Sequence, residues 1–325
     1  MAAPSKETLE RIAAETGHQP GTLEKVLRLL DLLQEIADDD LLGSRLALKG
    51  GTALNVFHLQ LDRLSVDIDL NYVGALDRDT MMKERPKIEE ALQRILKQQG
   101  YQVRLIPEGH AGGKWIARHA SALSGQGNIE IDLNYMFRQP LFGAERRNSI
   151  TLGGRQAKNV LVIDLHEIVA GKLVALLDRR AARDLFDAKR IFEIKDLDWR
   201  RIIVAMLAIG ATSRNDFRKA SVASIGADPK ELRDKLAICL PRSIFAARGS
   251  SEAWIAETLA VVKERMIPLL AFTDKERLFL DEINDKGHIR TELLDASPDL
   301  QKRIAEMPML AWKCEHVRQH KRPDA

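Results

Sequence analysis

Two aspartates in the segment Val66–Leu70 have a spacing that suits metal-dependent chemistry. Polar and apolar residues alternate there, which is the period of a half-buried strand. Residues two apart on a strand project from the same face, so we predict that Asp67 and Asp69 stand side by side, with Ile68 and Leu70 on the buried face. Two carboxylates about 4 Å apart repel each other by roughly 4 kcal/mol at an effective dielectric constant of about 20. A cation between them, protonation of one carboxyl or screening by water relieves this repulsion.

A second alternating segment, Ile129–Leu133, supplies a further carboxylate. A strand here can bring Asp132 alongside the first two aspartates, although Glu130 on the same strand face is an alternative. Mg²⁺ is bound in proteins by one or two carboxylates together with substrate phosphates, and three carboxylates can hold two metal ions. The pattern therefore favours a metal-dependent reaction on a phosphate substrate. For an aspartate pair alone, a solvated surface strand is the competing interpretation.

The glycines upstream of this strand favour a phosphate site. Gly50 and Gly51 lie between the strand-like run Leu46–Lys49 and a helix pattern that starts at Thr52. Glycines at such a junction let the backbone turn sharply and approach a ligand, and the helix N-terminus presents free N–H groups to phosphate. Thr52 can cap the helix or bind a phosphate oxygen, and Lys49 adds a positive charge. The alternative is an ordinary turn, and the segment is not a P-loop because the pattern GxxxxGKS/T does not occur.

The remaining pattern predicts the elements that must position these residues. Apolar residues at helical spacing predict helices at about 6–16, 21–38 and 79–98. Strand-like runs between turn signals lie at 46–49, 66–70, 101–106, 114–118, 128–133, 149–152 and 160–163. Helical patterns follow Asp164, with few strand-like runs after it. The sequence therefore predicts an α+β domain over residues 1–162, including the N-terminal helices, and a helical domain over residues 163–325.

The bulk properties of the chain are those of a folded soluble protein. Of its 325 residues, 45% are hydrophobic and 30% are charged, and the formal net charge is +3. Cys239 and Cys314 are the only cysteines and lie far apart, which argues against a disulfide framework and a structural zinc site. No apolar run of about 18 residues occurs, so we expect no membrane partner and a cytoplasmic location. The aromatic share of 5% argues against a nucleic-acid binder that relies on stacking.

Two charged residues in the helical half have candidate roles. Lys172 lies on an apolar stripe of the segment His166–Asp178, where an ammonium is costly unless it reaches an anion or extends to water. It is therefore either a triphosphate-binding lysine or a lysine that merely extends to solvent. Asp184 lies at a predicted helix start, where it either caps the helix or pairs with Lys172 or with an incoming acceptor group.

The order of these motifs resembles that of the polymerase-β-like nucleotidyltransferase superfamily: Gly-Gly-Thr, a helix, a strand with Asp-x-Asp, and a later strand aspartate. The resemblance implies an α+β fold with a mixed-sheet nucleotidyltransferase domain followed by a helical domain. It also implies an NTP substrate and Mg²⁺ or Mn²⁺ as cofactor, with Asp67, Asp69 and Asp132 as metal ligands. The nucleotide-binding residues that we predict in the first domain are Lys49, Gly50, Gly51, Thr52 and Ser65.

Longer segments narrow the resemblance. LKGGTALN, RLSVDIDLNY, IEIDLNY, EIVAGKLVALLDR and ARDLFD, in this order over residues 46–192, resemble the AbiEii/AbiGii-type nucleotidyltransferase toxins of bacterial toxin–antitoxin and phage-defence systems. That family also requires a helix lysine and a later aspartate. This implies that the helical domain contributes to the active site, that Lys172 also binds the nucleotide, and that Asp67, Asp69, Lys172 and Asp184 are catalytic. Thr52 stands where many members have serine, and it keeps the hydroxyl.

The family resemblance implies transfer of a nucleoside monophosphate from the NTP to RNA. In some members the acceptor is the 3′ end of transfer RNA, and the modification blocks translation; a cognate antitoxin is a further expected partner. Two other functions stay open, namely transfer of the nucleotide to a protein or small molecule, and a catalytically silent binding module with the same fold.

Clusters of basic residues give the sequence's own support for an RNA partner, because such residues can follow a line of phosphates. A solvated charged face is the competing interpretation. The clusters are Arg138, Arg146, Arg147, Arg155 and Lys158, then Arg179, Arg180, Arg183, Lys189 and Arg190, and the candidate RNA-binding residues among them are Arg146, Arg147, Arg179, Arg180 and Arg183.

Overall fold

The computed structural model describes residues 3–59, 63–107, 109, 111–246 and 250–320, and the chain divides into two compact units. Unit 1 consists of Met1–Arg138, Gly143–Asp164 and Ala237–Ala247, and unit 2 consists of Gln139–Phe142, Leu165–Leu236 and Arg248–Ala325. Hydrogen bonds attach the segment that begins at Ala237 to the rest of unit 1. The Thr22 hydroxyl donates to the Ile238 carbonyl over 2.8 Å, and the Leu64 N–H donates to the Cys239 carbonyl over 2.8 Å.

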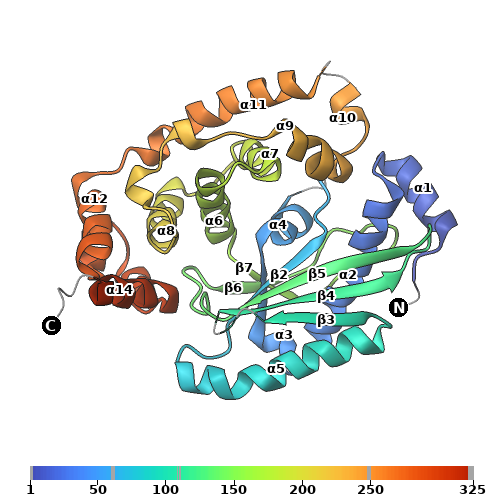
Figure 1. The fold of residues 1–325 in the computed structure, drawn as a ribbon, viewed down its shortest axis with the longest axis horizontal. Coiled ribbons are helices and arrows are strands. Elements are labelled where there is room, and N and C mark those ends of the chain that lie inside the picture. The colour runs from blue at the N-terminus through green and yellow to red at the C-terminus, as the bar shows by residue number, and fades with distance from the viewer. Residues whose placement is uncertain (1–2, 60–62, 108, 110, 247–249, 321–325) are drawn as a thin grey trace. The chain divides into compact units, whose positions relative to one another are not determined.

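Unit 1 is built on one mixed sheet of seven strands in the order β3-β4-β5-β2-β1-β7-β6 (Figure 1). The strands are β1 (Leu46–Lys49), β2 (Asp67–Tyr72), β3 (Gln102–Pro107), β4 (Gly112–Ala120), β5 (Gln126–Asn134), β6 (Ala144–Arg147) and β7 (Val160–Ile163). β2 is antiparallel to β1 and parallel to β5, and β1 is parallel to β7. A parallel pair needs a crossover connection, and the one between β2 and β5 runs through the helix α5 (Arg78–Gln98) and the β3–β4 hairpin. The α+β class with a mixed sheet, expected from the sequence, is confirmed.

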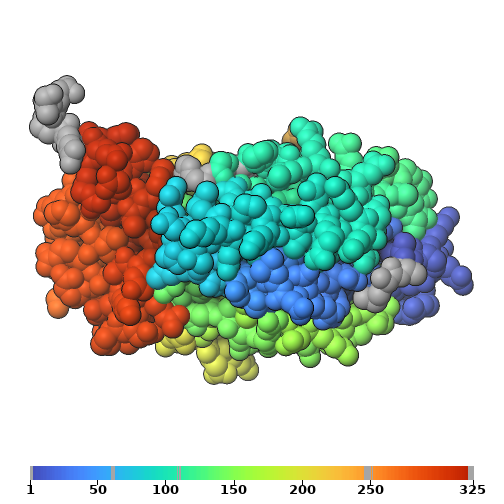
Figure 2. Space-filling view, turned by 90° about the horizontal axis from the view of Figure 1, so that it is seen from below, coloured from blue at the N-terminus to red at the C-terminus, as the bar shows by residue number. Residues whose placement is uncertain are grey.

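Unit 1 also contains helices, and several of them contact its sheet. Besides α5, they are α1 (Lys6–Thr16), α2 (Pro20–Asp38), α3 (Leu42–Arg45), α4 (Gly50–Thr52), the π-helix η1 (Ala53–His58) and the short α10 (Ser243–Ala246). The apolar stripe of α2 is fully buried, and α2, α3 and α5 contact strands of the sheet. Figure 2 shows α5 in cyan at the surface, in keeping with its alternation of buried apolar and exposed charged residues.

The structure differs from the sequence prediction in one strand: residues 149–152 form none, and β6 lies at 144–147. The prediction of a strand at 149–152 is wrong, because the Ser149 and Ile150 N–H groups donate to Ala157 and Val56 instead of to a neighbouring strand. The strand that was not predicted is β6, which forms an edge of the sheet antiparallel to β7. Three of its four residues are charged and none is fully buried, so the apolar alternation that marks a half-buried strand is missing.

Unit 2 is helical, and the described part of the chain contains no strand after β7. Its α-helices are α6 (Leu165–Asp178), α7 (Ala182–Ile191), α8 (Trp199–Ala211), α9 (Pro229–Glu231), α11 (Ser251–Met266), α12 (Asp274–Asp281), α13 (Pro298–Ala305) and α14 (Pro308–His320). Short 3-10 and π turns join them: η2 (Phe217–Lys219), η3 (Val222–Ser224), η4 (Leu232–Leu236), η6 (Pro268–Leu270), η7 (Glu282–Lys286) and η8 (Thr291–Leu293), while η5 (Ala237–Cys239) belongs to unit 1. Among the described helices, none combines the length and the apolar character that crossing a membrane requires.

His58, at the end of η1, couples the stability of unit 1 to pH. No hydrogen-bond partner of its Nε2 atom is found in the described part of the chain. Burial, and next the positive charge of Arg147, lower the pKa of His58 from 6.5 to about 4. Because the folded-state pKa lies below the unfolded one, protonation opposes folding. The contribution of His58 to stability is therefore complete above the unfolded pKa and is lost as the pH falls from 6.5 towards about 4.

We predict that His58→Gln removes this pH dependence. Between about pH 7.5 and about pH 4.5, the free energy of unfolding of the wild type should fall by roughly 2 kcal/mol more than that of the variant. Urea denaturation at a series of pH values measures the difference. The exposed His320→Gln serves as the control and should behave as the wild type. Parallel pH profiles for wild type and His58→Gln would contradict the prediction.

Candidate functional site

A row of four charged residues crosses the sheet of unit 1. Strand pairing places Lys114 opposite Asp132, Asp132 opposite Asp69, and Asp69 opposite Lys49. Residues directly opposite each other on neighbouring strands lie on the same face, so the charges along the row are positive, negative, negative and positive. The structure thus brings Asp132, from the second alternating segment, beside Asp69.

Asp67 and Glu130 form a second opposed pair on the same face, two residues along the strands. The other face of these strands is apolar, and Ile68, Leu70 and Ile131 are at most 1% exposed. The side-by-side position of Asp67 and Asp69 is therefore fixed by the burial of the residues between and beyond them. Both candidates for the third carboxylate lie next to an aspartate of the pair, Asp132 beside Asp69 and Glu130 beside Asp67.

Gly50 allows the backbone to approach the Asp69 carboxylate closely. It follows β1 directly, begins α4 and has a φ of +73°, a left-handed conformation that side chains disfavour. A Cβ atom on Gly50 would lie 2.1 Å from the Asp69 Oδ2 atom. Only glycine fits this position without a shift of the carboxylate. The turn therefore sets the start of the helical segment 50–58 against the carboxylate row.

Thr52 joins this helical segment to the carboxylate strand. Its side chain is fully buried, and its hydroxyl donates to the Asp67 carbonyl over 2.5 Å. The suggestion that Thr52 caps the helix is wrong, because the helix begins two residues earlier and Lys49 occupies the N-cap position. Ser65, immediately before the strand segment, is 6% exposed. The Lys49 ammonium lies 5.5 Å from the centre of the Phe137 ring.

Lys114 belongs to this site although sequence reasoning did not select it. Its Nζ atom lies 3.1 Å from Glu130 Oε2 and 3.5 Å from Asp132 Oδ2. The hydrogen bond to Glu130, followed by the charges of Asp132 and Glu130, raises the pKa of Lys114 against the opposing effect of burial. The segment 114–118 was predicted as a strand, but only the register between β4 and β5 shows which acids this lysine meets.

The donor set of this face suits a hard divalent cation. In the described residues no three His, Cys, Asp or Glu side chains converge closely enough to form a complete metal site. Mg²⁺ does not require such a cage, since it keeps waters and takes one or two carboxylates together with substrate phosphates. Asp67, Asp69 and Asp132 offer carboxylate oxygens on one face, beside a glycine turn with no side chain in the way. These residues therefore fit the ion that the sequence implies.

In unit 2, Lys172 is the centre of a buried charge cluster. Its Nζ atom lies 2.8 Å from Asp187 Oδ2 and 3.6 Å from Asp184 Oδ1. The two aspartates are at most 1% exposed, and Arg179 also donates to Asp184 through two nitrogens, over 2.6 and 3.1 Å. Asp184 does not cap α7, because Ala181 is the N-cap and Asp184 lies in the first turn. Lys172 therefore reaches anions instead of extending to solvent, and Asp187 is a partner that the sequence did not single out.

Several of the basic residues considered for RNA binding already have protein partners. Arg147 donates to Glu145 over 2.5 Å, and Arg146 donates to the Asn159 carbonyl over 2.8 Å. Arg138 is buried and donates to two backbone carbonyls, and Arg155 forms an ion pair with Asp31. Arg138 and Arg155 thus have structural roles. The basic clusters seen in the sequence are therefore not available as a whole to bind RNA.

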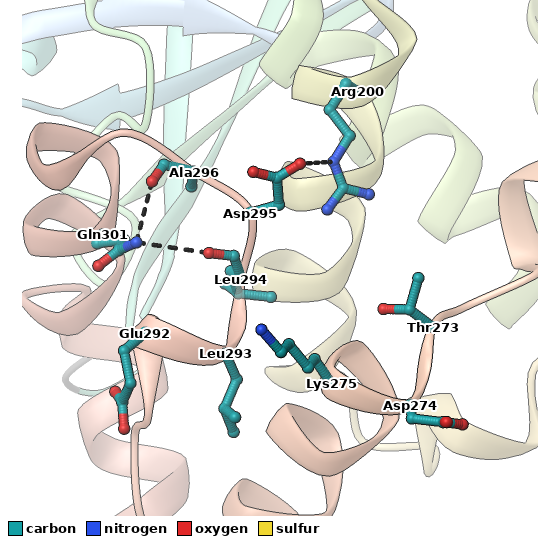
Figure 3. Close-up of a pocket in the computed structure, with 10 residues that line it drawn as sticks. All are labelled: Arg200, Thr273, Asp274, Lys275, Glu292, Leu293, Leu294, Asp295, Ala296 and Gln301. Atoms are coloured by element: carbon teal, nitrogen blue, oxygen red, sulfur yellow. Dashed lines mark hydrogen bonds and ion pairs between the residues drawn. The ribbon is translucent and has the colours of Figure 1, made fainter.

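A separate cavity of about 860 Å³ lies in unit 2, lined in part by α12 and by the segment 292–296 (Figure 3). Two of its polar side chains are held within the protein: Arg200 pairs with Glu276 and Asp295, and the Gln301 amide donates to the Leu294 and Ala296 carbonyls. The carboxylate face of unit 1 carries the chemistry that the sequence motifs indicate, and this cavity does not.

Comparison with known proteins places the chain in a class and then in a family. The fold is similar to that of a nucleotidyltransferase: the structure of MenT4, a nucleotidyltransferase toxin from Mycobacterium tuberculosis H37Rv, aligns with a TM-score of 0.56 and 15% identity over 98% of this chain and 100% of that one. Residues 31–254 match the family model described as nucleotidyl transferase AbiEii toxin, type IV TA system. The chain therefore belongs to the AbiEii nucleotidyltransferase toxin family, as its motifs predicted. No curated protein matches it in sequence.

We predict that Gly50→Ala destabilises unit 1 by about 2 kcal/mol or more, because alanine is strained at this φ and its Cβ meets the Asp69 carboxylate. The matched control is Gly171→Ala on α6, where a Cβ meets nothing within 4 Å. That substitution should be neutral or stabilising by about 0.5–1 kcal/mol. Urea denaturation gives both values, and equal stabilities for the two variants would refute the close approach.

Proposed function

We propose that this toxin-family nucleotidyltransferase moves a nucleoside monophosphate from an NTP to RNA, at the 3′ end of transfer RNA, and thereby blocks translation. The observation that carries the proposal is the placing of Asp67, Asp69 and Asp132 on one face, against the Gly50 turn. In the reaction the acceptor hydroxyl attacks the α-phosphorus, the bond to pyrophosphate breaks, and the hydroxyl proton passes to a carboxylate or to water.

The carboxylates that would bind the divalent cation, Mg²⁺ or Mn²⁺, are those of Asp67, Asp69 and Asp132, each ion taking one or two of them together with substrate phosphates and water. When bound, the ion would activate the acceptor hydroxyl and neutralise charge on the phosphates. Asp69 makes no ion pair within the described part of the chain, so its charge is available to a cation. This asymmetry with Asp132, which Lys114 already neutralises in part, makes Asp69 the anchor of the proposed metal site.

The turn Gly50–Thr52 is our candidate for the triphosphate. The first N–H groups of a helix have no carbonyl partners within that helix, so they can donate to phosphate oxygens. Gly50, which is partly exposed, has no side chain that would cover this helix start, and Lys49 adds a charge. Thr52 is fully buried and its hydroxyl donates to the Asp67 carbonyl, so we propose that Thr52 serves the nucleotide site by holding the turn against the strand. Ser65 stays in the proposed nucleotide-binding set.

We also propose that Lys172 and Asp184 of unit 2 are required for activity. The resemblance implies these two residues, and the lysine is held between two buried aspartates in an orientation that packing fixes. Lys172 is 12% exposed, so part of the side chain is open to a ligand. The exposed Arg180 and the partly exposed Arg183 would contact RNA, in the cytoplasm where NTPs and transfer RNA occur, and a cognate antitoxin would neutralise the protein.

The decisive test combines the purified protein with Mg²⁺, bulk transfer RNA and each α-labelled NTP in turn, followed by a denaturing gel. We expect label in the transfer RNA band, lost in Asp67→Asn/Asp69→Asn, because the amides keep the shape of the carboxylates but remove the charges that bind the ion. Arg118→Gln, on the neighbouring strand and away from the row, should keep the activity. If protein or a small molecule is labelled instead of RNA, the proposed RNA acceptor is wrong. If nothing is labelled with any acceptor, the chain is better described as a silent binding module.

Lys172 needs a test that separates chemistry from folding. Lys172→Met leaves two buried carboxylates without their ammonium, which should cost on the order of 3 kcal/mol of unfolding free energy. Lys172→Met/Asp187→Asn removes one of those charges and should regain part of the loss. We predict that the double variant, folded by urea denaturation, still fails to label RNA. Normal labelling by a folded double variant would limit Lys172 to a structural role.

A further inference from the structure

Lys114 lies at one end of the charged row and neutralises only one of its two central aspartates. In the sheet order β4-β5-β2, the strand of Asp132 lies between the strand of Lys114 and the strand of Asp69. The ammonium of Lys114 lies 3.5 Å from Asp132 and 3.1 Å from Glu130. It therefore attracts the Asp132 carboxylate towards β4, on the side away from Asp69.

The lysine at the other end of the row behaves differently. Lys49 is opposite Asp69, but its ammonium lies over the Phe137 ring, 5.5 Å from the ring centre. Within the described residues neither Lys49 nor any other cation forms an ion pair with Asp69. One aspartate of the central pair is thus ready to meet a cation, and the other is already engaged by one.

The Lys114 contacts are of a kind that a divalent cation can replace. The side chains of Lys114, Glu130 and Asp132 are 31%, 39% and 37% exposed. Ion pairs this exposed are weak, because water screens them and long side chains lose freedom when they form. A divalent cation between Asp69 and Asp132 would bring two positive charges close to the ammonium, and the two cations would repel each other.

We propose that Lys114 is a positioning residue that competes with the divalent cation for Asp132. It compensates the repulsion between Asp132 and its acidic neighbours until the cation binds, and it keeps Asp132 turned towards β4. Binding of the cation requires that this ion pair open. The proposal rests on the proposed function, because it assumes that Asp69 and Asp132 belong to a metal site.

The test is a titration of the full-length protein with Mn²⁺ in the absence of nucleotide, followed by calorimetry and by the electron paramagnetic resonance signal of free Mn²⁺. Lys114→Met should bind Mn²⁺ about tenfold more tightly than the wild type, since a competing charge is gone. Lys114→Arg keeps the charge and should bind close to wild-type strength. Lys83→Met, which removes an exposed lysine of α5, controls for the change in net charge and should also match the wild type.

Further variants separate this proposal from the proposed function. When Asp132→Asn is added to both the wild type and Lys114→Met, the two proteins should bind Mn²⁺ equally, because the shared ligand is gone. If Asp69→Asn loses Mn²⁺ binding but Lys114→Met binds Mn²⁺ as tightly as the wild type, the proposed role of Lys114 is wrong and the metal site stands. No Mn²⁺ binding by any variant would instead overturn the metal site itself. If Lys114→Met does not fold, Lys114→Gln provides the same comparison. If the role of Lys114 is purely structural, replacing it will lower the stability without raising the Mn²⁺ affinity.

Discussion

The parallel pairing of β2 with β5 sets two carboxylates, Asp69 and Asp132, directly against each other. Like charges at this spacing oppose the pairing that creates them, so the rest of unit 1 has to compensate. The apolar opposite face supplies most of the compensation, since Ile68, Leu70 and Ile131 are buried only in this register. Slipping β5 by one residue would expose that face, and the repulsion is therefore held in place by the hydrophobic core.

The backbone next to this pair is shaped to leave the charges accessible. Gly50 brings the start of a helical segment against Asp69 where any side chain would collide with the carboxylate. The Thr52 hydroxyl then donates a hydrogen bond to the carbonyl of Asp67, which ties the turn to the strand. The helix start that we propose for the phosphates and the carboxylate face that we propose for the cation are thus adjacent, which is the arrangement that a metal-bound triphosphate needs.

The charged cluster of unit 2 is built in the opposite way. Asp184 and Asp187 are almost completely buried, and each is matched by a cation at short distance. A buried, compensated cluster fixes the orientation of Lys172, whereas the half-exposed carboxylates of unit 1 remain open to exchange of partners. Both sets of residues lie within the part of the chain that matches the AbiEii family model, residues 31–254.

The sequence by itself determined what depends on local periodicity: the shared face of Asp67 and Asp69, the glycine junction before the helix, most helices and strands, and the family. Only the tertiary structure decided which residues meet across strands and helices. Asp69 faces Asp132 and not Glu130, Lys114 joins them, and Asp187 holds Lys172, because register and helix packing join segments far apart in the chain. The charged edge strand β6 was missed for the same reason, since its pairing with β7 leaves no apolar pattern in its own residues.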